Sequence, residues 1–144
     1  MFKNILVPVD GSAASLQAVA SAVSLAKAYE GTVTAIYVID PYPFTGVGTD
    51  FAYGQDQYLA AATAEANAAI RVAQEAIEAG GVKVVTRVVE AHSIWRGILD
   101  AASALGSDIV VMGSHGRHGL EKLLGSVAQR VVSHSHVPVL VVRD

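Results

Sequence analysis

The sequence contains no cysteine, and this absence removes several classes of protein at once. Without cysteine there is no disulfide scaffold, no thiolate zinc site, no thiol redox motif and no cysteine nucleophile. The chain has 144 residues, of which 52% are apolar. That length matches one ordinary domain with a buried core, and that composition excludes intrinsic disorder.

Charge is also scarce, because only 16% of the residues are charged and the net charge at pH 7 is -3. A surface that tracks the phosphates of a nucleic acid needs an excess of lysine and arginine, which this chain lacks. Single basic side chains remain available for a small anion. The sequence therefore argues against a nucleic-acid partner and leaves a small anionic ligand open.

Long apolar runs are missing as well. No uninterrupted apolar stretch approaches the length that spans a bilayer, so we expect no membrane insertion. The first residues, Met1-Phe2-Lys3-Asn4, lead straight into a strand-like run without the pattern of a signal peptide. We therefore expect a cytoplasmic protein.

What the sequence does contain is an alternation of strand-like and helix-like segments. The apolar runs predict strands at Ile5–Val9, Thr32–Ile39, Thr86–Val89 with the preceding Val82–Val85, Asp108–Met112 and Pro138–Val142. Between them, helical spacing predicts helices from Leu16 to a stop at Gly31, and over Gln55–Ala79, Ser93–Leu105 and Ser126–Ser133. We predict one α/β domain over residues 1–144. It should be doubly wound and Rossmann-like, with a five-stranded parallel sheet of order 3-2-1-4-5 and helices on both faces.

Only the segment Pro41–Gly54 departs from this alternation. It is rich in proline, glycine and aromatic residues, which predicts a structured surface loop. Two interpretations remain open for its aromatic side chains: they form a lid or partner contact, or they pack against the edge of the sheet.

The predicted sheet also predicts where a ligand binds. In open parallel sheets, ligands lie beyond the carboxyl ends of the strands where the connections reverse direction, here between the first and fourth strands. Asp10-Gly11-Ser12 follows the first strand, and a glycine-rich segment with Gly113, Gly116 and Gly119 follows the fourth. Glycine permits positive φ and lets backbone amides converge on an anion. A tight turn that needs glycine is the alternative interpretation.

The helix that opens at Gly125-Ser126 strengthens the prediction of an anion site. Its free N–H groups and the positive end of its dipole favour a phosphate, and the Ser126 hydroxyl is available either to cap the helix or to donate to the phosphate. His115 and Arg117 flank the glycines. For His115 we consider a contact with phosphate or with a metal ion, and for Arg117 a contact with a terminal phosphate or a solvated position. The segment is neither a Walker A loop nor a dinucleotide fingerprint.

Together these segments resemble the universal stress protein family. The resemblance rests on Asp10-Gly11-Ser12, Gly113-Ser114-His115-Gly116 and Gly125-Ser126, continues through Ser126–Val131 and Val137–Val142, and spans the whole chain. It is to the branch with a Gly-x2-Gly-x9-Gly-Ser/Thr motif, and it implies a site for ATP, or for ADP or AMP, with Mg²⁺ as an accompanying ion. The family alternatives are a branch that binds no nucleotide and a slow ATP hydrolase.

The resemblance also implies which residues form the nucleotide site. Asp10 resembles the partner of a ribose hydroxyl or of a hydrated Mg²⁺. The other implied positions are Pro8 and Val9 beside the adenine and ribose, Ile36 and Val38 in the adenine wall, Met112, Gly113 and Gly116 in the ribose and phosphate loop, and Gly125, Ser126, Val127 and Ala128 at the phosphates.

One departure from the family motif affects the phosphate loop. Eight residues separate Gly116 from Gly125, where the common pattern has nine. One residue shifts the chain by about 3.8 Å, which is comparable to the width of a phosphate site. The departure puts the phosphate geometry in doubt, and with it the preference for ATP over ADP or AMP.

The sequence supports three further expectations. The apolar last strand, Val137–Val142, lies at a sheet edge, and we expect it to pair with a second copy in a homodimer, as the family does. Trp95 has helical spacing with Ile94, Ile98 and Leu99, which predicts core packing. No serine, histidine and carboxylate arrangement indicates catalysis, so we expect a regulatory binding protein with an unidentified protein partner.

Overall fold

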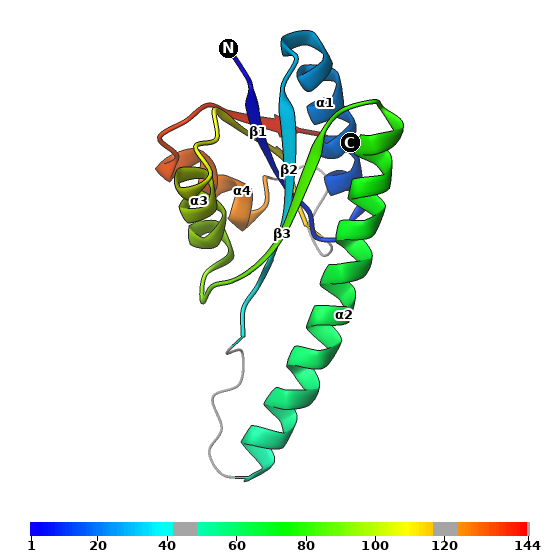
Figure 1. Cartoon of the computed structure of the whole chain (residues 1–144). Helices are drawn as coiled ribbons and strands as arrows, with labels where there is room; N and C mark the ends of the chain where they lie inside the picture. The colour runs from blue at the N-terminus through cyan, green and yellow to red at the C-terminus, as the bar shows by residue number, and fades with distance from the viewer. Residues whose placement is uncertain (42–48, 117–123, 144) are drawn as a thin grey trace.

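The computed structural model describes residues 1–41, 49–116 and 124–143. Within them lies a five-stranded sheet of order β3-β2-β1-β4-β5, in which every described strand pair is parallel. Figure 1 shows the sheet between two layers of helices, with α3 and α4 on one side and α1 and α2 on the other. The predicted fold class and strand order are confirmed.

The strands are short and close to their predicted positions. They are β1 (Asn4–Pro8), β2 (Thr32–Ile39), β3 (Val84–Glu90), β4 (Ile109–Gly113) and β5 (Val139–Val142). The register pairs Pro8 with Ile36 on one side of β1 and Leu6 with Val110 on the other. This arrangement places the ends of β1 and β4 side by side, where the connections diverge to opposite faces of the sheet.

The helices are α1 (Ala13–Tyr29), α2 (Thr49–Ala79), α3 (Ile94–Ala104) and α4 (Ser126–His134). Helix α2 begins earlier than predicted, so residues 49–54 are helical and the expectation of a loop up to Gly54 is wrong for them. The rest of the predicted loop, residues 42–48, lies outside the described residues. In the described part of the chain, no helix is both long and apolar enough to cross a membrane.

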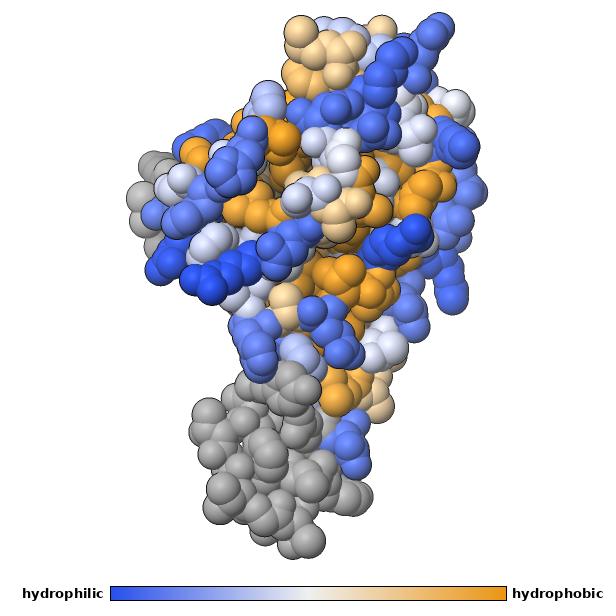
Figure 2. All heavy atoms as spheres, turned by 60° about the vertical axis from the view of Figure 1, so that its left-hand side comes forward, coloured by the Kyte–Doolittle hydropathy of each residue, from blue (hydrophilic) through white to orange (hydrophobic). Residues whose placement is uncertain are grey.

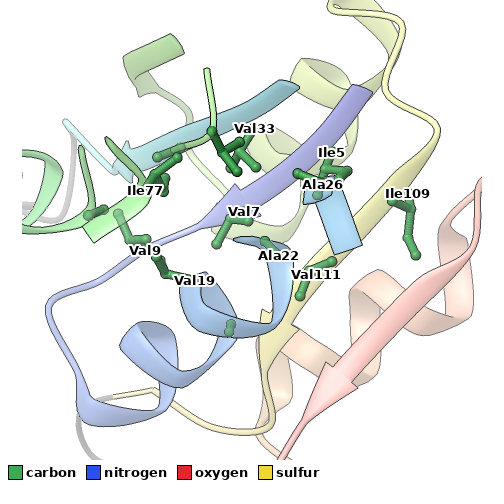
Figure 3. Packing of buried hydrophobic residues seen from close by; sticks show 14 of the residues in the cluster. Ile5, Val7, Val9, Val19, Ala22, Ala26, Val33, Ile77, Ile109 and Val111 are labelled. Carbon is green, nitrogen blue, oxygen red and sulfur yellow. The ribbon is translucent and has the colours of Figure 1, made fainter. Parts of the chain in front are cut away.

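Two apolar clusters hold the layers together, one on each face of the sheet. The first lies under α1 and α2, and Figure 3 shows Ile5 and Val7 of β1 packed toward Ala22 and Ala26 of α1. The second lies under α3 and α4 and contains Leu6 of β1. Because alternate side chains of β1 enter opposite clusters, both faces of the strand are buried and its sequence is continuously apolar.

Candidate functional site

A cavity of about 810 Å³ opens at the carboxyl ends of β1, β2 and β4. Its volume lies within the range that holds small-molecule ligands. The described lining consists of Pro8, Val9, Asp10, Ser15, Tyr37, Val38, Ile39, Asp40, Tyr58, Ala61, Ala62, Glu65, Ile94, Ile98, Met112, Gly113, His115, Gly116, Gly125, Ser126, Val127 and Ala128. Every layer of the fold therefore contributes to one site at the reversal point of the sheet.

The segment after β1 holds Asp10 in a fixed position. The Asp10 carboxylate accepts a hydrogen bond from the Ser12 backbone N–H at 2.9 Å through Oδ1. Ser12 in turn caps α1, because its hydroxyl accepts from the Ser15 N–H at 3.1 Å. The Ser15 hydroxyl donates to the Ser12 carbonyl at 3.0 Å. These local bonds leave Oδ2 of Asp10 toward Gly116, where an added Cβ would lie 2.9 Å away.

The segment after β4 is closed by two backbone hydrogen bonds. The Ser114 N–H donates to the Val142 carbonyl at 2.9 Å, and the Ser114 carbonyl accepts from the Gly125 N–H at 2.7 Å. The residues before and after the glycine-rich loop are thereby held together beside β4. The eight-residue spacing between Gly116 and Gly125 does not prevent this closure.

Helix α4 begins at the cavity without a capping side chain. Gly125 occupies the N-cap position and Ser126 is the exposed first residue of the helix. The first-turn N–H groups of a helix have no acceptor within it, and here the residues that carry them, Ser126, Val127 and Ala128, all line the cavity. Of the two roles considered for Ser126, capping is therefore wrong. The geometry is that of an anion-binding helix terminus.

The charged groups that line the described cavity are mainly acidic. Asp10, Asp40 and Glu65 bring carboxylates, and His115 brings an imidazole whose Nδ1 lies 3.2 Å from the Gly116 carbonyl oxygen. No group of three or more histidine, aspartate or glutamate side chains in the described residues has a metal-binding arrangement. Asp10 alone still fits Mg²⁺, because this ion is commonly held by one or two carboxylates together with substrate phosphates.

The structure brings most of the sequence-predicted site residues together. Pro8, Val9, Asp10, Val38, Met112, Gly113, His115, Gly116, Gly125, Ser126, Val127 and Ala128 all line the cavity. Ile36 does not, and its assignment to the cavity wall needs correction. Its side chain is fully buried among apolar residues, and it contributes its carbonyl, which accepts from the Val9 N–H at 2.8 Å. Arg117 lies outside the described residues.

Sequence reasoning missed the wall that α2 forms. Tyr58, Ala61, Ala62 and Glu65 follow one another at helical spacing and all face the cavity. Tyr37, Ile39 and Asp40 from the end of β2 and Ile94 and Ile98 from α3 were also missed. The spacing on α2 was visible in the sequence, but nothing in it indicated which face of the helix meets a ligand.

Known proteins share both the sequence and the fold. The model of the universal stress protein family matches residues 1–143. The chain belongs to this family. A universal stress protein of Methanocaldococcus jannaschii is 38% identical over 99% of this chain and 83% of its own length. One of Bacillus subtilis is 31% identical, covering 99% of this chain and all of the relative.

A solved structure supports the same conclusion. The universal stress protein UspA from Lactobacillus plantarum superposes with a TM-score of 0.88 at 28% identity, over 99% of this chain and 98% of that one. The family resemblance read from the glycines is therefore confirmed. In this chain the cavity is lined by Gly113, Gly116 and Gly125, three of the glycines that carry the resemblance.

Proposed function

We propose that this universal stress protein binds an adenine nucleotide, ATP or its ADP or AMP form, in the cavity between β1 and β4. The protein acts as a regulatory module whose nucleotide-bound state is recognised by a protein partner. The observation that carries the proposal is the convergence of the uncapped α4 terminus, the backbone at Gly113–Gly116 and the fixed Asp10 carboxylate on one cavity.

Each part of a nucleotide has a matching surface. Val38, Ile94 and Ile98 offer an apolar wall to a base. The Asp10 carboxylate accepts hydrogen bonds, which suits a ribose hydroxyl. Amide donors at the start of α4 suit phosphate oxygens, and hydrogen bonds to a charged group contribute roughly 1.5–3 kcal/mol each. Three such bonds supply much of the ~8 kcal/mol that micromolar affinity requires.

Structural relatives bind related ligands. One solved universal stress protein, with a TM-score of 0.71 to this chain, is in complex with cAMP. Another, from Archaeoglobus fulgidus and with the same TM-score, is in complex with dAMP. At 24% and 19% identity these two show the shared fold, and their ligands support an adenine nucleotide as the class to test first.

Calorimetry on a Gly116→Val variant tests the site. The Gly116 Cβ would lie 2.9 Å from Oδ2 of Asp10, so the added side chain displaces the carboxylate and enters the cavity. We expect ATP affinity to fall at least roughly tenfold, which corresponds to about 1.4 kcal/mol. Gly54→Val is the matched control, because a Cβ there meets nothing within 4 Å. Equal ATP affinity in both variants and the wild type refutes the site.

The nucleotide form and its metal ion are resolved by titration. ATP, ADP, AMP and cAMP, each with and without Mg²⁺, report how many phosphates the site accepts. If Asp10 holds Mg²⁺ with the phosphates, Mg²⁺ increases the affinity for ATP more than that for AMP. A bound Mg²⁺ would neutralise part of the phosphate charge, and Asp10 would hold the ion in position. Phosphate release at saturating ATP tests the slow-hydrolase alternative, for which we expect no turnover above the protein-free rate.

The proposed assembly is a homodimer through Val137–Val142. Strand β5 is an edge of the described sheet, contains no charged residue and leaves Leu140 42% exposed. Unpaired apolar edges promote association unless charge blocks it. Leu140→Lys should therefore shift sedimentation toward the monomer, while Val88→Lys on the β3 edge, where Val88 is 40% exposed, should not. A monomeric wild type contradicts this assembly. The cytoplasmic location stays a prediction.

A further inference from the structure

Trp95 lies in a half-buried position between α3 and α4. Its predicted core packing is only partly realised, because one side of the indole meets polar side chains. The ring of His134, in the last turn of α4, lies against it with a centroid separation of 4.5 Å and an interplanar angle of 32°. The two rings join the first turn of α3 to the last turn of α4.

His134 is fixed in this position by its own helix. Its Nδ1 lies 2.8 Å from the Arg130 carbonyl oxygen. A carbonyl only accepts hydrogen bonds, so Nδ1 carries the proton and the orientation of the ring is set. The imidazole therefore forms a prearranged part of the surface rather than a freely rotating side chain.

Two guanidinium groups flank the indole. The Arg96 Cζ lies 5.0 Å from the Trp95 ring centroid and the Arg130 Cζ lies 5.9 Å from it, both within cation–π range. Both arginines are exposed, and neither forms an ion pair with a carboxylate of the described residues. Asp100, one turn along α3 from Arg96, forms none with it either. We call Trp95, Arg96, Arg130 and His134 the tryptophan patch.

The face that carries this patch is seen in Figure 2, which turns the α3 and α4 side of Figure 1 forward. Hydrophilic side chains gather across it, with apolar side chains between them. The chain as a whole has a net charge of -3, whereas α3 and α4 together contain Arg96 and Arg130 against the single carboxylate of Asp100. The patch is therefore a local cationic site on an acidic protein.

We propose that the tryptophan patch docks an acidic segment of a protein partner. Tryptophan and arginine are the residue types most enriched where binding energy concentrates in interfaces, and planar guanidinium groups match carboxylates in a bidentate geometry. Because each guanidinium already stacks on the indole, the arginine side chains lose less conformational entropy when a partner binds. The two arginines are thus complementary to carboxylates, and the half-buried ring of Trp95 is complementary to the apolar part of an acidic side chain such as glutamate.

The tryptophan patch lies on the same two helices that begin at the cavity, α3 and α4. Docking at the patch does not require a ligand in the cavity. Helix α3 begins at Ile94 and α4 at Ser126, and both residues line the cavity. A ligand that shifts the start of either helix changes the spacing of Trp95, Arg130 and His134 at the patch. Docking of an acidic segment is nevertheless testable on the protein whether or not it holds a nucleotide.

Trp95 is the only tryptophan in the chain, so its fluorescence reports the patch directly. We titrate the full chain with a short poly-glutamate peptide, a poly-glutamine peptide of equal length and an oligothymidylate of equal charge, and repeat each titration by calorimetry. We expect saturable binding of poly-glutamate, weakened by added salt, and none of poly-glutamine. Arg96→Gln and Arg130→Gln should each weaken binding roughly tenfold, because each removes charge-assisted hydrogen bonds.

Arg71→Gln on α2 and Arg87→Gln on β3 are the matched controls, since both remove an exposed arginine from an element other than α3 and α4. Unchanged Trp95 emission together with no calorimetric heat for poly-glutamate overturns the proposal. So does an equal loss of binding in the control variants. Tighter binding of oligothymidylate assigns the patch to nucleic acid instead. A change of oligomeric state in Arg96→Gln without peptide assigns it to a second copy, and either result also overturns the proposal.

Discussion

Two segments meet at the cavity, one after β1 and one after β4, and they reach their shapes by different means. Residues 10–15 after β1 are held by side chains, because Asp10, Ser12 and Ser15 all form hydrogen bonds with the local backbone. Ser114, directly after β4, is held by backbone bonds to Val142 of β5 and to Gly125 at the start of α4. Segments with similar composition therefore differ in which substitutions they tolerate.

Glycine serves a different purpose in each segment. Gly11 has a φ of 82°, which side-chain-bearing residues rarely adopt, while its Cβ would meet only the Ala69 Cβ at 3.9 Å. Gly113 and Gly116 have no positive φ. A Cβ on Gly113 would lie 2.9 Å from the Ala14 Cβ and 3.0 Å from its carbonyl carbon. Gly113 and Gly116 therefore do not use the positive φ that glycine permits, and the close approach of neighbouring atoms leaves no room for a Cβ at either position.

The largest effect is expected for Gly113→Val, which breaks the contact between β4 and α1. The new side chain collides with the backbone of Ala14, and such overpacking costs typically about 1–3 kcal/mol of unfolding free energy. ATP affinity should fall in parallel because α1 carries Ser15 at the cavity. Urea denaturation and calorimetry measure both. Gly54→Val, with open space around the Cβ, is the control, and equal stability of the two variants contradicts the close-approach explanation.

A smaller effect is expected for Gly11→Ala, which tests backbone conformation rather than space. Placing an L-residue at this φ costs about 1 kcal/mol of stability. Gly81→Ala is the matched control, since Gly81 has a φ of 77° and no neighbour within 4 Å of its Cβ. Thermal denaturation should show similar losses for both variants, whereas ATP binding should weaken only in Gly11→Ala. If ATP binding weakened equally in both variants, the conformation of the Asp10 segment would not be the cause of the weakening.

The smallest effect is expected for Ser114→Ala. This variant tests whether the hydroxyl in the segment after β4 lacks a hydrogen bond, unlike the Ser15 hydroxyl in the segment after β1. The Ser114 Oγ is buried, with the residue 1% exposed, and has no hydrogen-bond partner in the described residues. Removing an unsatisfied hydroxyl should raise the unfolding free energy by up to about 1 kcal/mol and leave ATP affinity unchanged. Ser15→Ala removes a hydrogen bond of 3.0 Å and should therefore lower the unfolding free energy instead. Destabilisation by both substitutions would show that Ser114 has a partner.

Much of the site was predictable because its residues follow strands directly. Asp10 and Gly113 occupy the ends of apolar runs, and the ends of parallel strands meet at one edge of the sheet. Tyr58 and Glu65 were not predictable, because a regular helix gives no local signal of which face meets a cavity. Ile36 was misplaced for a related reason: it shares a sheet face with Val38 but lies deeper along β2, where the core fills the space.

The sequence by itself determined the strand and helix alternation, through local hydrophobic periodicity, and the usual strand order of a doubly wound sheet follows from that alternation. Its short glycine-containing segments carried the resemblance to the family. Only the tertiary structure decided why Gly113 is glycine, that α2 forms a cavity wall and that Arg96, Arg130 and His134 gather around Trp95. These features depend on distances between residues far apart in the chain. Packing of one layer against another sets such distances, and no local pattern encodes them.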